Sequence, residues 1–128
     1  MKVAANSPFR HLAGHRYMSL TTFRKDGTPV PTPVWFAQEG DHLYVVTGAE
    51  SGKVKRIRRN AQVEVAPCTV RGELLGESAE AMARILPEED APHADALLNR
   101  KYSWQKWAFD LVGRLRGDRR VWLEIMPM

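Results

Sequence analysis

The sequence has little of what would crosslink a protein or place it in a membrane. Its 128 residues include one cysteine, Cys68, which excludes an intramolecular disulfide and a cysteine-rich metal site. No stretch approaches the ~20 apolar residues that span a bilayer, and the opening MKVAANSPFRHLAG has no apolar run typical of a secretory signal. The expectation is a cytoplasmic protein with reduced cysteine and no membrane partner.

Signals of metal binding and of several domains are also missing. His11 and His15 have helical spacing but lack the carboxylate of an HExxH pattern, so we interpret them as solvated and predict no metal site. There is no internal repeat, low-complexity tract or linker. We therefore expect one domain over residues 1–128, with residues 1–14 as a flexible or partner-contacting N-terminal arm.

Acidic residues are absent from one segment of high positive charge. Residues 51–60 (SGKVKRIRRN) contain five cations and no acid. The whole chain has 19 Lys and Arg against 15 Asp and Glu, so removing these five leaves 14 against 15, a net charge of −1. A charge so concentrated indicates an anion-binding site.

Runs of β-branched and aromatic residues predict a mainly β fold. Strands are expected at residues 17–23, 30–37 and 42–47, joined by short turns into an antiparallel meander. Further strands are expected at residues 62–67 and 119–126. Residues 78–86 are ambiguous, because their composition favours a helix and their position favours a strand.

Three helices are expected. Ser51 is a good N-cap for the basic segment, where Val54 and Ile57 share one face. Pro87 and the acids after it predict a helix to about Arg100. An amphipathic helix follows, with apolar residues at Trp104, Trp107, Ala108, Leu111, Val112 and Leu115. The total is an α+β fold, a small antiparallel barrel or curled sheet.

Prolines occupy alternate positions of the second expected strand, at Pro29, Pro31 and Pro33. Alternate amides face the same neighbour, so these prolines remove hydrogen-bond donors from one edge only. That edge is either a protected outer edge or a wall beside something other than a strand.

Three interpretations of the basic segment compete. A Walker-type phosphate loop is excluded, because only three residues separate Gly48 and Gly52 and Val54 replaces the magnesium-binding hydroxyl. A nucleic-acid face is disfavoured, because the rest of the chain is slightly acidic. A phosphate site at the helix N-terminus remains, built from Ser51, Lys53 and Arg56.

The order of motifs resembles a known family. Thr-Pro-Val-Trp-Phe, then Leu-Tyr-Val-Val-Thr-Gly-x-x-Ser-Gly-Lys-x-Lys-x-x-x-Arg-Asn, then a strand, is similar to the split β-barrel flavin and deazaflavin oxidoreductases. These are relatives of pyridoxamine 5′-phosphate oxidase, and the likeness is greatest to the branch that uses the deazaflavin coenzyme F420. The resemblance implies a six-stranded antiparallel split barrel in which residues 78–86 form a strand. It also implies a homodimer with cofactor sites at the interface.

The resemblance also implies positions for the cofactor. Its phosphate would lie at Ser51, Gly52 and Lys53. Its ring and ribityl chain would lie along Pro31, Thr32, Pro33, Val34, Val46 and Thr47. The oxidases have an arginine immediately before the phosphate lysine, where this chain has Gly52. We expect Lys55, Arg56 or Arg59 to replace that charge, or to meet a longer anionic tail on F420.

The expected function is hydride transfer between F420 and an unidentified small organic substrate. The alternatives are an FMN-dependent oxidoreductase of the same fold, a cofactor carrier without turnover and a nucleic-acid-binding module. No side chain stands out as a catalytic acid or base. Trp35, Trp104 and Trp107 either line the substrate pocket or pack in the core or a dimer interface.

Overall fold

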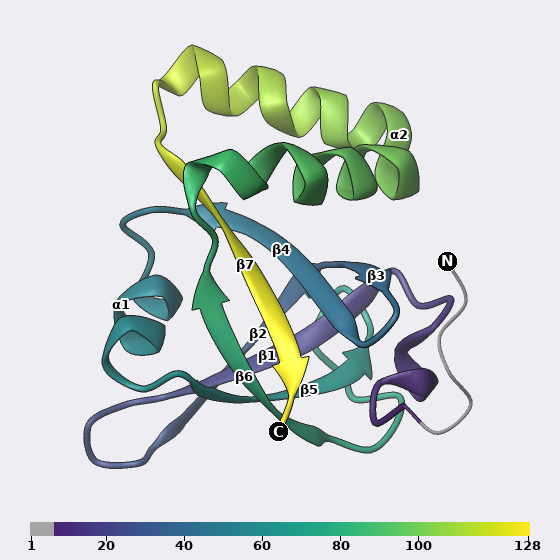
Figure 1. The fold of residues 1–128 in the computed structure, drawn as a ribbon, viewed down its shortest axis with the longest axis vertical. Coiled ribbons are helices and arrows are strands. Elements are labelled where there is room, and N and C mark those ends of the chain that lie inside the picture. The colour runs from purple at the N-terminus through teal and green to yellow at the C-terminus, as the bar shows by residue number, and fades with distance from the viewer. Residues whose placement is uncertain (1–6) are drawn as a thin grey trace.

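Seven antiparallel strands form one curled sheet in the computed structural model of the chain, which describes residues 7–128. The sheet order is β2-β1-β5-β6-β7-β4-β3 (Figure 1). The strands are β1 Tyr17–Phe23, β2 Pro29–Trp35, β3 Ala37–Glu39, β4 His42–Gly48, β5 Gln62–Cys68, β6 Ala79–Ile85 and β7 Arg120–Pro127. The helices are α1 Gly52–Arg59 and α2 Ala91–Arg116, with 3₁₀ turns η1 Arg10–Leu12 and η2 Glu88–Asp90. The expected α+β split barrel is confirmed, with seven strands rather than six.

The expected second strand is divided into two. β2 ends at Trp35 and β3 begins at Ala37, so only Phe36 separates them. β2 pairs with β1, whereas β3 pairs with β4 at the opposite end of the sheet. The predicted meander is therefore wrong at this point, because the chain bends at Phe36 and crosses from one sheet edge to the other.

The bend depends on Tyr102, which is far away in the sequence. Its buried hydroxyl accepts a hydrogen bond from the amide of Phe36 at 2.9 Å. The same hydroxyl lies 2.9 Å from the carbonyl oxygen of Phe36 and 2.6 Å from that of Arg16, to which it donates. The amide and carbonyl groups of Phe36 do not need a neighbouring strand, because the Tyr102 hydroxyl forms hydrogen bonds with both.

The prolines of β2 explain why the barrel stays open beside this strand. β2 pairs with β1 over all its residues, from Tyr17↔Trp35 to Phe23↔Pro29. Its other edge lacks donors at Pro29, Pro31 and Pro33, so no strand can extend the ladder there. The pairing of β4 with β3 stops at Tyr44, and the rest of β4 comes close to this proline edge. The result is a split between β2 and β4.

The barrel encloses an apolar core into which α1 packs. The core includes Met18, Leu20, Val45, Leu123 and Ile125, all fully buried. The buried side chains of α1, Val54 and Ile57, belong to the predicted apolar face, and the helix packs near β1 and β6. These contacts fix the N-terminus of α1 beside the end of β4.

The N-terminal arm predicted over residues 1–14 is not an arm where the structure describes it. Residues 1–6 lie outside the described part of the chain. Phe9 and Leu12 are fully buried in the barrel core, and the amide of Phe9 is held by the hydroxyl of Ser7. Residues 7–14 are therefore part of the barrel.

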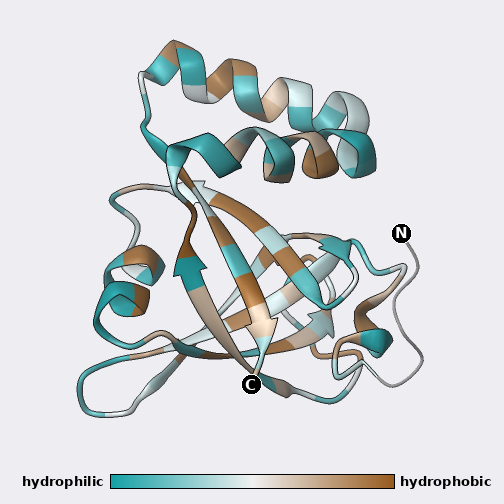
Figure 2. Ribbon diagram, in the orientation of Figure 1, coloured by the Kyte–Doolittle hydropathy of each residue, from teal (hydrophilic) through white to brown (hydrophobic). Residues whose placement is uncertain are grey.

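The two helices expected after residue 86 form a single kinked element, α2. It begins at Ala91 because residues 88–90 form the 3₁₀ turn η2, and its interior residue Ser103 has φ 50° and ψ −124°. The kink folds α2 into two antiparallel runs, of which residues 104–116 form the outer one (Figure 1). Figure 2 shows hydrophobic and hydrophilic residues alternating along this outer run. Two of its apolar side chains, Trp104 and Trp107, are 72% and 66% exposed. No helix in the described part of the chain is long and apolar enough to cross a membrane.

Candidate functional site

The split between β2 and β4 contains a cavity of about 280 Å³. Pro33, Val34 and Trp35 of β2 form one side, and Val46, Thr47 and Gly48 of β4 form the other. Lys53 of α1 and Phe109 of α2 complete the lining. The sequence prediction named five of these lining residues as cofactor-binding: Pro33, Val34, Val46, Thr47 and Lys53.

One wall of this cavity is aromatic and rigid. Trp35 stacks on Tyr102 with 4.6 Å between ring centroids and 13° between ring planes. Phe109 lies 5.6 Å from Trp35 at 56°. Tyr102 is itself fixed by its hydrogen bonds to Phe36, so Trp35 has little freedom to move. A flat, fixed aromatic surface beside a donor-free proline edge suits a planar ring system.

The opposite end of the cavity carries an unpaired cation at a helix N-terminus. Ser51 caps α1, and its hydroxyl oxygen accepts from the amide of Val54 at 3.4 Å. Lys53 Nζ donates to the hydroxyl of Thr47 at 3.3 Å, and that hydroxyl lies 3.4 Å from the one of Ser51. No carboxylate in the described part of the chain pairs with Lys53. We call Thr47, Ser51 and Lys53 the anion cradle.

The environment of Lys53 also favours binding of an anion. Burial lowers the pKa of the Lys53 ammonium, and the nearby Arg56 lowers it further. Burial and the positive charge of Arg56 therefore disfavour the protonated form of Lys53 while no anion is present. An oxyanion in the cradle would stabilise that protonated form, since it supplies a negative charge and hydrogen-bond acceptors.

The structure places the guanidinium of Arg56 beside Gly52, which the sequence did not reveal. A Cβ at this position would stand 2.8 Å from Nη1 of Arg56, so the guanidinium occupies the space of a side chain at residue 52. Arg56 is anchored there by a 2.6 Å hydrogen bond from its Nε to the hydroxyl of Thr22. Of the three cations expected to replace the missing arginine, Arg56 is the one whose guanidinium lies beside Gly52, although the residue itself belongs to the last turn of α1.

The other predicted positions are not brought into this cavity. Lys55 is exposed, and Arg59 points to the β1–β2 hairpin, where it lies 3.4 Å from the carbonyl oxygen of Phe23. Pro31 lines a separate cavity with residues of β1 and β5. Thr32 is half-buried opposite Leu20 of β1. Their contact with a cofactor stays a prediction.

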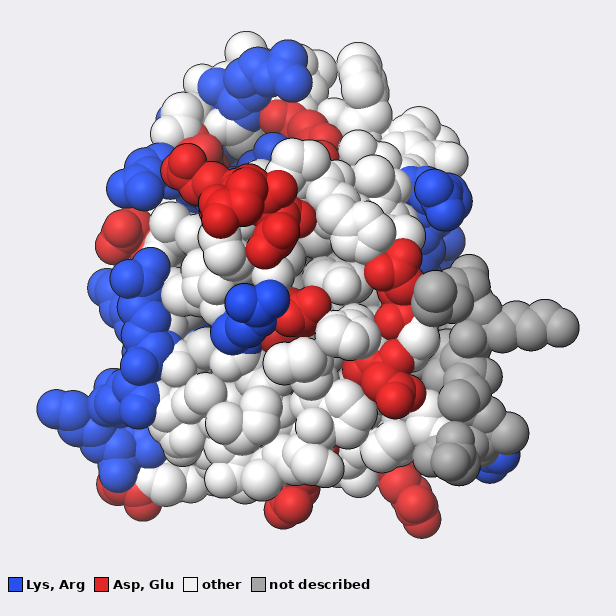
Figure 3. All heavy atoms as spheres, in the orientation of Figure 1, with Lys and Arg blue, Asp and Glu red and all other residues white. Residues whose placement is uncertain are grey.

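The basic residues of α1 make an exposed edge beside the anion cradle. Figure 3 shows Lys and Arg side chains gathered along the side of the molecule that α1 forms. No carboxylate from the described residues forms an ion pair with any cation of α1; the ion pairs lie elsewhere. Charge that is not neutralised at an edge raises the local concentration of anionic ligands.

Sequence reasoning missed several residues near the cavity. Phe109 and Tyr102 come from α2, more than 50 residues from the strands that they contact, and only a contact in space could reveal them. Trp35 was named as a possible lining residue and lines the cavity. Trp104 and Trp107 point away from it.

Candidate acids and bases lie outside the cavity. Tyr44 and His42 both contact Glu124, at 3.2 and 3.0 Å, and Arg84 contacts the same carboxylate at 2.7 Å. Burial and the neighbouring Glu124 raise the pKa of Tyr44 to about 12. Burial also raises the pKa of the Cys68 thiol. Among the described residues, no group of His, Cys, Asp or Glu is arranged to hold a metal ion.

The sequence pattern of the pyridoxamine 5′-phosphate oxidase family matches residues 9–127 of this chain. The chain therefore belongs to the pyridoxamine 5′-phosphate oxidase family, a class of split-barrel proteins to which the fold and the cavity already pointed. No curated protein matches the chain.

Solved structures of several biochemical kinds share the fold. A heme-storage protein, HutZ from Vibrio cholerae, has a TM-score of 0.69 at 15% identity, covering 90% of this chain and 83% of that one. A FAD-binding protein from Mesorhizobium loti has a TM-score of 0.62 at 20% identity, covering 92% and 83%. An F420 reductase has a TM-score of 0.62 at 21% identity, covering 98% and 96%. At these identities the likeness shows the fold alone.

Proposed function

We propose that the split of the barrel binds the deazaflavin coenzyme F420 and that the protein is an F420-dependent oxidoreductase acting on a small organic substrate. The observation that carries the proposal is the unpaired Lys53, held with Ser51 at one end of a cavity whose other end is aromatic. A phosphate and a planar ring need these two surfaces. The family match and the likeness to an F420 reductase support the same direction.

The residues of the chain have separate roles in this proposal. Ser51, Lys53 and the first amides of α1 hold the phosphate, with Arg56 beside them. Trp35 and the proline edge of β2 fix the plane of the ring and exclude water from one of its faces. When bound, F420 supplies or accepts the hydride. The described residues that line the cavity include no carboxylate, histidine or cysteine. In this proposal their role is to hold and orient the cofactor.

A parallel titration with F420 and FMN, followed by fluorescence, tests the proposal. We expect F420 to bind with a micromolar or lower Kd and FMN to bind at least ~100-fold more weakly, a difference of about 2.7 kcal/mol. Tighter binding of FMN than of F420 would replace the proposal with an FMN-dependent enzyme of the same fold.

Two further outcomes would also contradict it. F420 that binds but is never oxidised or reduced across a panel of organic acceptors and donors would indicate a cofactor carrier. The protein could also bind neither cofactor but bind nucleic acid, with an affinity that falls steeply as salt rises. That result would indicate that the basic edge is a nucleic-acid-binding surface.

We also propose that the chain forms a homodimer through the outer run of α2. Trp104, Trp107, Leu111, Val112 and Leu115 stand exposed on this run. Together they present on the order of 600 Å² of apolar surface, at the upper end of what a monomer exposes in one patch. A stable interface needs about 800 Å² from each partner, so this patch could form most of one. Val112 also lies beside Phe109, so the interface would border the cofactor site.

Light scattering coupled to size-exclusion chromatography tests the dimer. We expect a dimer for the wild type and a monomer for Trp107→Glu combined with Leu115→Glu, because two buried carboxylates on each copy would face apolar surface. Val70→Glu is the matched control, since Val70 is 61% exposed on a distant turn. A monomeric wild type, or a double variant that remains dimeric, would refute the assignment of this face.

A further inference from the structure

A second cavity lies on the other side of the anion cradle. Its volume is about 650 Å³, and it shares Gly48 and Phe109 with the cavity in the split. Ser51 is part of its wall. The anion cradle therefore stands at the junction of two cavities, one walled by aromatic residues and one bounded by the end of α2.

The far wall of the second cavity carries arginines. Arg116 and Arg119 line it, and neither side chain forms a hydrogen bond or ion pair with another described residue. Arg120 also lines it, but Asp110 holds that guanidinium, which stacks 5.7 Å from the ring of Phe109. Glu50 and Asp118 border the same cavity and pair with no cation of the described chain. Arg116 and Arg119 are therefore the two unpaired cations among the described residues of this cavity, beside two carboxylates that are also unpaired.

The backbone fixes these arginines near the anion cradle. α2 ends at Arg116 and is capped by Gly117, whose φ of 73° suits glycine and whose amide donates back to the carbonyl oxygens of Arg114 and Gly113. This cap turns the chain sharply between Arg116 and Arg119. The carbonyl of Arg119 then accepts a hydrogen bond at 3.0 Å from the amide of Ala49, in the loop that leads to Ser51. The two loops are therefore tied together.

We propose that the second cavity binds carboxylate or phosphate groups that the cofactor carries beyond its first phosphate, with Arg116 and Arg119 as their partners. This inference rests on the proposed function. A ligand that ended at the phosphate in the anion cradle would leave the second cavity and both arginines without a partner. A ligand with an anionic extension would fill the two cavities and the junction between them.

Titration of F420 against three variants tests the subsite. The double variant Arg116→Ala with Arg119→Ala is expected to weaken F420 binding by about 5- to 30-fold, because two charge-assisted contacts from exposed arginines are lost. Its affinity for FMN, which has a phosphate and no extension, is expected to stay the same. Arg114→Ala is the matched control, since Arg114 is exposed on the same run of α2 and lines neither cavity.

The outcomes separate this inference from the proposed function. Wild-type protein that binds F420 while the double variant binds it equally well refutes the subsite and leaves the function intact. Equal weakening of F420 and FMN also refutes it, because the arginines would then act on the shared phosphate or on the fold. If the wild type does not bind F420, the proposed function fails by itself. The subsite is then tested with a triglutamate peptide, which should bind the wild type and Arg114→Ala but not the double variant; equal binding to all three, or to none, overturns it.

Discussion

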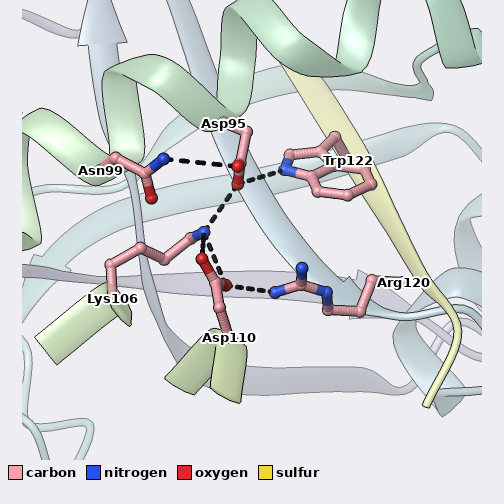
Figure 4. A network of polar contacts seen from close by, with 6 residues as sticks. All are labelled: Asp95, Asn99, Lys106, Asp110, Arg120 and Trp122. Carbon is pink, nitrogen blue, oxygen red and sulfur yellow. Dashed lines mark hydrogen bonds and ion pairs between the residues drawn. The ribbon is translucent and has the colours of Figure 1, made fainter. Parts of the chain in front are cut away.

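Replacing Lys106 with methionine is expected to lower the free energy of unfolding by about 2–4 kcal/mol. Lys106 is fully buried and lies in the outer run of α2. Its ammonium contacts Asp95 of the inner run at 2.7 Å and Asp110 of its own run at 2.7 and 2.8 Å (Figure 4). The substitution keeps the volume of the side chain but leaves two carboxylates without their shared cation.

The network around Lys106 joins α2 to the barrel. Trp122 of β7 donates from its indole nitrogen to Asp95 at 3.2 Å, and Arg120 forms an ion pair with Asp110. These partners remain in the variant, and the carboxylates are partly exposed, so the expected loss lies below that of a fully buried pair. We also expect faster amide exchange over residues 104–116, because Lys106 holds the two runs of α2 together.

The loss should depend on pH. Burial alone would raise the pKa of Asp110, but hydrogen bonds and charge from Lys106 and Arg120 outweigh it and lower this pKa below 3.8. The stabilisation is therefore present above about pH 4 and disappears as the pH falls through the lowered pKa. Urea unfolding at pH 7 and pH 3 measures this, with Arg114→Met as the exposed control. An unchanged stability of Lys106→Met at pH 7, or a gap from wild type that does not narrow at pH 3, would contradict the expected role of the network.

Replacing Lys53 with alanine is expected to weaken F420 binding by about 1–3 kcal/mol, the range for a charge-assisted hydrogen bond. Lys53 is the unpaired cation of the anion cradle, and its amine reaches the hydroxyl of Thr47. Arg58→Ala is the matched control, because Arg58 lies on the same helix, is exposed and lines neither cavity. It should change the Kd by less than about 0.5 kcal/mol.

The same titration, repeated between about pH 7 and 10, isolates the charge on Lys53. Its pKa in the free protein is lowered from 10.5, so the ammonium begins to lose its proton at a lower pH than an ordinary lysine. Since the phosphate binds the protonated form, affinity should fall as the pH rises through this pKa. Lys53→Ala should show a flatter profile. Equal Kd values for wild type and Lys53→Ala, with the same pH profile, would show that the phosphate binds elsewhere.

Local sequence patterns were sufficient for several elements of the fold. β1, β4 and the cap of α1 at Ser51 lie where composition and turn chemistry predicted them. The alternating prolines correctly indicated a strand edge that no other strand joins. These features depend on neighbouring residues in the chain, which is why a single sequence reveals them.

Other features depend on contacts between distant residues. The break at Phe36 requires the hydroxyl of Tyr102, 66 residues away, so the pattern of residues 30–37 predicted one continuous strand. The amphipathic spacing of Trp104, Trp107 and Leu115 was correct, but it could not say that this face points outward. Lys106 can be buried because its ammonium pairs with Asp95. The two residues meet only when the two runs of α2 fold against each other.

The candidate site was predictable only where its residues are close together in the sequence. The anion cradle depends on residues 47–53, which are close in sequence, and the structure brings Thr47, Ser51 and Lys53 together. Phe109 of the first cavity and Tyr102, which stacks on Trp35, come from α2. Arg116 and Arg119 of the second cavity come from the end of α2 and the loop after it. Lys55 and Arg59 line neither cavity, so their contact with the cofactor stays a prediction.

A crystal structure of the protein grown with F420 tests the central claim most directly. We expect the cofactor phosphate within hydrogen-bonding distance of Ser51 and Lys53, and the ring against Trp35 in the split between β2 and β4. A phosphate bound away from the N-terminus of α1, or a ring outside the split, would contradict this account.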